Sequence, residues 1–143
     1  MPDITAVTHA QNIRYDKQAE ALYIIDQTLL PGEEREIRLT TLDEMVEAIR
    51  ALRVRGAPAI GICAGYCMYL LARDAWTEDR QAFLRKLTED GEALNASRPT
   101  AVNLKHMLDR VLAVAESMPC ADVASIQDAM GQAARAIHQE DIA

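Results

Sequence analysis

The segment from Pro58 to about Arg73 constrains the fold more than any other part of the chain. Placed on a helix, it is apolar on nearly every side, with Ile60, Ile62, Cys63, Tyr66, Cys67, Leu70 and Leu71 among its residues. Such a helix is stable in water only when other elements cover it. We therefore expect it to be the buried centre of one domain, and 143 residues are enough to build that domain. Gly61 and Gly65, one turn apart on this helix, would allow a neighbouring backbone to approach closely.

Residues 11–40 follow a different pattern. Short runs of β-forming residues are separated by polar turns, at Ile13–Tyr15, Leu22–Ile25 and Ile37–Leu39. Pro31-Gly32 is a strong turn signal between the second and third runs. This pattern predicts a three-stranded antiparallel meander.

Residues 41–143 change to a helical period. Thr41 and Glu44 have the spacing of a capping box. The first helix is expected to begin there and to end at Gly56, and further helices to begin near Pro58, Thr77, Thr100 and Asp122. The fold class is thus α+β and mostly helical: a small N-terminal antiparallel β-meander followed by a bundle of about five helices.

Charge and composition exclude several classes of function. The net charge of −7 argues against nucleic-acid binding, because no basic surface is large enough to neutralise phosphates in bulk. No apolar run approaches the ~20 residues that span a bilayer, and no signal peptide precedes the domain. Three cysteines without a secretory signal are typical of reduced thiols. We expect a cytoplasmic protein with no nucleic-acid or membrane partner.

The stretch VRGAPAIG, Val54–Gly61, interrupts helical sequence with an arginine, two glycines and a proline. A helix that begins near Pro58 has unpaired backbone amides and a positive dipole end, which favour an anion. Gly56 would let a ligand approach the backbone, and Arg55 can donate two hydrogen bonds to a phosphate or carboxylate. A plain turn between two helices explains the same residues. A P-loop does not, because Ile62 and Cys63 stand where Lys and Ser/Thr are required.

The stretch SRPTAVNL, Ser97–Leu104, repeats this design. Arg98 and a proline precede a helix for which Thr100 is a natural N-cap. Arg55 and Arg98 are therefore predicted to converge on one anion. The alternative is two capped helices with solvated arginines.

The remaining candidates for chemistry are weaker. Cys63 and Cys67 share a helix face, but without two further ligands nearby a pair of core thiols explains them better than a metal site. Cys120 has no adjacent histidine to activate it, and the histidines share no motif. We therefore expect no metal, no cofactor and no catalytic residue in this chain.

Three stretches together carry a resemblance to a known family. ALYIIDQTLLP (Ala21–Pro31), VRGAPAIG and SRPTAVNL occur in an order and spacing that closely resemble the N-terminal part of methylthioribose-1-phosphate isomerase. That enzyme belongs to the initiation factor 2B alpha/beta/delta-like superfamily, with ribose-1,5-bisphosphate isomerase and regulatory subunits of a translation nucleotide-exchange factor. The resemblance extends along the whole chain.

The resemblance implies a function and a set of site residues. The family enzyme is an intramolecular oxidoreductase that converts an aldose phosphate to a ketose phosphate in methionine salvage. Its substrate-binding residues correspond here to Arg55, Gly56, Ala57 and Arg98. Its catalytic cysteine and aspartate lie in a C-terminal Rossmann-like domain for which residues 1–143 contain no match. The ligand would be a small sugar phosphate, and the full-length family forms homodimers.

The resemblance thus implies the N-terminal, substrate-binding part of the isomerase, inactive alone, with the enzyme's C-terminal domain as partner. The surface that meets that domain should be unusually apolar. The alternative is a non-catalytic sugar-phosphate-binding or regulatory protein of the same superfamily.

Overall fold

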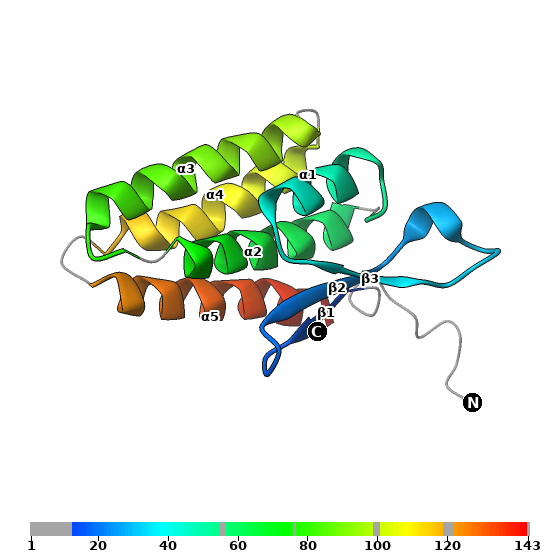
Figure 1. Ribbon diagram of the computed structural model, residues 1–143, viewed down its shortest axis with the longest axis horizontal. Coiled ribbons are helices and arrows are strands. Elements are labelled where there is room, and N and C mark those ends of the chain that lie inside the picture. The colour runs from blue at the N-terminus through cyan, green and yellow to red at the C-terminus, as the bar shows by residue number, and fades with distance from the viewer. Residues whose placement is uncertain (1–12, 55–56, 76, 99–100, 119–121, 143) are drawn as a thin grey trace.

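The computed structural model describes residues 13–54, 57–75, 77–98, 101–118 and 122–142. A small sheet lies against one side of a layer of helices that run roughly parallel or antiparallel to one another (Figure 1). This arrangement agrees with the predicted order of a β-meander followed by five helices.

The sheet is built from β1 (Ile13–Asp16), β2 (Ala21–Ile25) and β3 (Glu36–Leu39), paired antiparallel in sequence order. The register places Leu22 between Tyr15 and Leu39, and Ile24 between Ile13 and Ile37. All six side chains therefore point to the same face, because every second residue of a strand does. That face packs on the helices, and the meander prediction is confirmed.

Helix α1 (Leu42–Arg50) begins as predicted and ends earlier than predicted. The capping box is formed: Glu44 N–H donates to Thr41 Oγ1 at 3.2 Å, and Thr41 N–H donates to Glu44 Oε1 at 3.1 Å. The helix does not continue to Gly56, because Leu52 adopts a φ of +63°. Arg53 N–H then donates to Ala48 C=O at 2.9 Å and Leu52 N–H to Ile49 C=O at 3.2 Å. These two bonds form a Schellman motif, which closes the helix.

Helix α2 (Ala57–Asp74) occupies the centre, as its sequence predicts. Residues 59–68 are all buried. The helix contacts α3 (Arg80–Ser97), α4 (Val102–Glu116), α5 (Val123–Ile142), α1 and two strands of the sheet. A Cβ on Gly65 would lie 3.1 Å from Ile137 and 3.5 Å from the Cα of Ala134, so α5 lies against this glycine as expected.

Two helix starts differ from the sequence-based predictions. Asp79, rather than Thr77, caps α3 by accepting hydrogen bonds from the amides of Gln81 and Ala82. Thr100 lies outside the described residues, and the N-cap position of α4 is occupied by Ala101, which has no side chain able to cap. Asp122 accepts a 2.8 Å hydrogen bond from Ser125 N–H at the start of α5, where a helix start was predicted.

Candidate functional site

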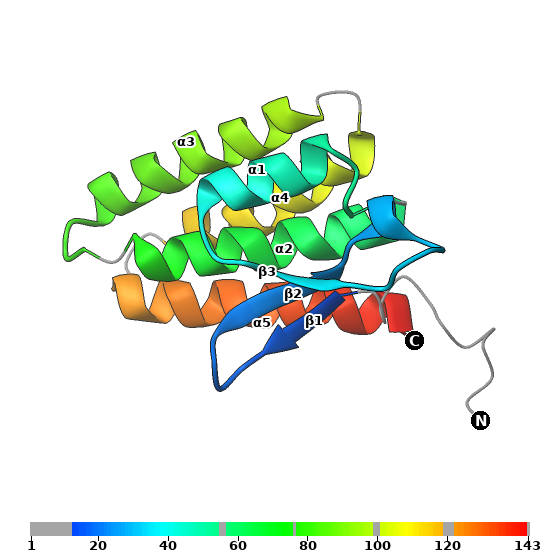
Figure 2. The same cartoon turned by 45° about the vertical axis from the view of Figure 1, so that its right-hand side comes forward.

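The helices α2 and α4 run in the same direction and begin at the same end of the molecule (Figures 1 and 2). The two helices are in close contact within their first two turns: a Cβ built on Gly61 would lie 2.5 Å from Nδ2 of Asn103 and 3.0 Å from Cγ of Met107. A side chain at position 61 would require Asn103 or Met107 to move. Two positive helix ends therefore lie side by side, an arrangement that attracts an anion more strongly than either end alone.

Two of the four predicted site residues, Ala57 and Arg98, lie among the described residues. Arg55 and Gly56 lie outside the described residues, between buried Val54 and the first residue of α2, Ala57. Arg98 forms the C-cap of α3, and its C=O accepts a 2.9 Å hydrogen bond from Ala101 N–H, the residue that precedes α4. Arg98 thus stands one tight turn before the start of α4. The convergence of the two guanidinium groups remains a prediction.

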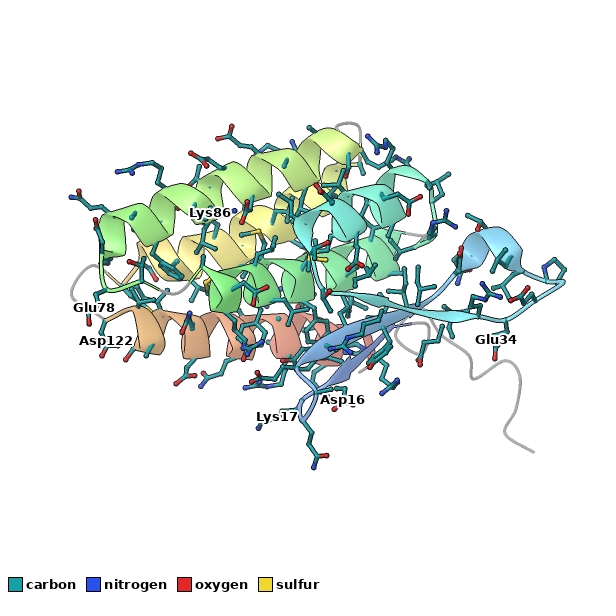
Figure 3. The ribbon with its side chains drawn as sticks, in the orientation of Figure 1. Asp16, Lys17, Glu34, Glu78, Lys86 and Asp122 are labelled. Atoms are coloured by element: carbon teal, nitrogen blue, oxygen red, sulfur yellow. The ribbon has the colours of Figure 1, made fainter. Side chains whose placement is uncertain are left out.

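Among the described residues, no side chain caps the start of α4. Ala101 makes no side-chain capping bond, and Val102 is 81% exposed. Acidic side chains such as Glu78 and Asp122 lie at the other end of the helical layer (Figure 3). These two acidic residues are therefore far from the starts of α2 and α4.

A network of charged side chains anchors the segment that leads to Arg55. Asp26, only 3% exposed, ends the run ALYIID and caps the short helix η3 (Gln27–Leu29). Its Oδ2 accepts a 2.9 Å hydrogen bond from Nη1 of Arg53, whose Nε donates to Glu47 at 2.8 Å. The same Nη1 donates to Thr28 Oγ1 at 3.2 Å. Arg53 is therefore paired with two carboxylates.

The pKa values of these groups reflect the pairing. Burial raises the pKa of Asp26, but hydrogen bonds from Thr28 and Arg53 outweigh it, and the pKa lies below its ordinary value. The hydrogen bond from Arg53 likewise lowers the pKa of Glu47, and the two carboxylates raise that of Arg53. Sequence reasoning missed this network. Its signal was present in Asp26, an acidic residue that follows an apolar strand directly.

Other reactive groups are buried away from the helix starts. Cys63 and Cys67 are fully buried with their sulfurs 3.7 Å apart, and their mutual hydrogen bond and burial raise the pKa of Cys67. Tyr66 Oη lies 2.8 Å from Nδ1 of His138, and burial raises the pKa of Tyr66 to about 12. Cys120 is outside the described residues. Within the described part of the chain, no group of three or more His, Cys, Asp or Glu is arranged to hold a metal ion.

The predicted apolar docking surface is not found in the described part of the chain. There, the exposed large hydrophobic residues are Leu30 and Val102. The charged residues on the outer faces of the helices explain the difference, since each helix turns its apolar stripe inward. A hollow of about 170 Å³ between α3 and α4 is lined partly by Asn95, Lys105 and Asp109, and its mixed lining suggests no particular ligand.

Comparison with known proteins places this geometry in a family. The sequence profile of the initiation factor 2 subunit family matches residues 53–143, which begin at the anchoring Arg53 and include both helix starts. The chain belongs to the initiation factor 2 subunit family. The proteins similar to this chain include some named as isomerases and one named as a translation initiation factor subunit.

Two relatives of known name are sugar-phosphate isomerases. The methylthioribose-1-phosphate isomerase of Parabacteroides distasonis is 42% identical over 131 residues, covering 92% of this chain and 39% of the relative. The 5-deoxyribose 1-phosphate isomerase of Moorella thermoacetica is 45% identical over 118 residues, covering 82% and 34%.

Two solved structures share the fold. The 5-methylthioribose 1-phosphate isomerase from Pyrococcus horikoshii superposes with a TM-score of 0.84 at 33% identity, covering 90% of this chain and 36% of that one. The translation initiation factor eIF-2B subunit delta from A. fulgidus gives 0.82 at 30% identity, with 92% and 37% covered. The chain thus spans less than two fifths of the length of these proteins. Among the described helices, none is long and apolar enough to cross a membrane.

Proposed function

We propose that this chain is the N-terminal, substrate-binding part of an S-methyl-5-thioribose-1-phosphate isomerase. The single observation that carries the proposal is the contact between the starts of α2 and α4 at Gly61. It brings two helix N-termini together in a family whose similar members include isomerases of phosphorylated sugars.

The substrate phosphate would bind at these helix starts. Backbone amides of Gly56 and Ala57 donate to it, and Arg55 and Arg98 add charged hydrogen bonds, each worth about 1.5–3 kcal/mol. Arg53 is already paired with two carboxylates and takes no part in direct binding.

The chain alone would bind substrate and leave the chemistry to other residues. Aldose–ketose isomerisation moves hydrogen between adjacent carbons and requires positioned acid and base groups. Residues 52–62 and 97–104, which contain the two arginine motifs, have no Asp, Glu, His, Cys, Lys or Tyr, although Lys105, His106 and Asp109 follow beside Val102 on α4. The two motifs are suited to orient a phosphate, and they offer no general acid or base.

The functional partner would be the C-terminal Rossmann-like domain of the same enzyme, which supplies the catalytic cysteine and aspartate. The complete protein would be a cytoplasmic homodimer that acts in methionine salvage without a cofactor. An alternative is a non-catalytic, sugar-phosphate-binding regulatory protein, which the similarity to the eIF-2B subunit favours.

Activity and binding separate these possibilities. Purified chain is incubated with 5-methylthioribose 1-phosphate, and the ketose product is measured with and without a separately expressed C-terminal domain. We expect no turnover by the chain alone and turnover after the domain is added. Turnover near 1 per second or more by the chain alone would overturn the proposal. Binding without turnover in both mixtures would favour the regulatory alternative.

A further inference from the structure

We draw no further inference here: the strongest candidate, the segment of residues 27–35 between β2 and β3, which projects beyond the helices (Figure 1) and exposes Leu30, carries none because nothing in the described part of the structure shows what covers it.

Discussion

The segments that lead into α2 and α4 are held in place by different interactions. Before α2, the chain is anchored by a buried carboxylate, a paired arginine and a strained leucine. Before α4, the turn from Arg98 to Ala101 is held by a backbone hydrogen bond, and Ala101 provides no cap. Within the described residues, the segment before α2 is thus held by several interactions and the one before α4 by a single backbone hydrogen bond.

The largest expected difference between the junctions is in stability. Arg53→Met leaves Asp26 buried without its cationic partner, and we expect a loss of about 2–3 kcal/mol. This is below the ~3–5 kcal/mol of a fully buried pair, because the Arg53 side chain is 32% exposed. Arg98→Met should change the free energy of unfolding by no more than about 0.5 kcal/mol. Urea denaturation of both variants checks this contrast, which equal losses would contradict.

Of the two junctions, the one before α2 should contribute to the pH dependence of stability, through Asp26. The pKa of Asp26 is depressed in the folded protein, so its contribution to stability is present above its ordinary pKa of 3.8. That contribution is lost as the pH falls through the lower folded value. The unfolding free energy of the natural chain and of Asp26→Asn, measured from pH 6 to pH 2.5, should therefore converge in acid. If the difference in unfolding free energy between the two proteins stayed constant across this range, the effect of Asp26→Asn would not come from the loss of the charge.

The contact between α2 and α4 can be tested at Gly61. Gly61→Ala places a methyl group 2.5 Å from Asn103 Nδ2 and 3.0 Å from Met107, and it should destabilise the fold by about 1 kcal/mol after the gain in helix propensity is deducted. Gly91→Ala is the control, since its nearest neighbour would be Met68 Sδ at 3.7 Å. That variant should be neutral or slightly stabilising in thermal unfolding. If the two alanines behave alike, the two helix starts are not held together at Gly61.

The smallest effect concerns the start of α4. Ala101→Asp supplies the missing N-cap and should stabilise the chain by about 0.5–1 kcal/mol. The new carboxylate occupies amides that an anion would use, so phosphate affinity should fall in the same variant. Calorimetry gives both quantities. Higher stability with unchanged phosphate affinity would remove the start of α4 from the anion site.

Local sequence predicted a large part of this fold. The alternation in residues 11–40 located all three strands, and Thr41 with Glu44 marked the start of α1. The apolar segment after Pro58 predicted the buried central helix. Each of these signals lies within a few residues of the structure it specifies, because strand period, helix period and capping are short-range effects.

The missed features depend on residues far apart in the chain. The early end of α1 follows from Leu52 and from Arg53, which pairs with a carboxylate 27 positions away. Local propensity gives no reason to place a leucine at a positive φ, and an ion pair outweighs propensity only once packing has buried one partner.

The sequence by itself thus determined the order of elements, the central position of α2 and the two arginine-containing breaks. The tertiary structure alone decided that the breaks stand before adjacent, parallel helix starts. The side-by-side arrangement of the two helix starts depends on the contact between Gly61 and Asn103, which lie on different helices. A glycine in a helix states locally only that a side chain is missing. Which neighbour occupies the space, here the side chains of Asn103 and Met107, is set by the packing of the whole domain, because several helices pack against α2.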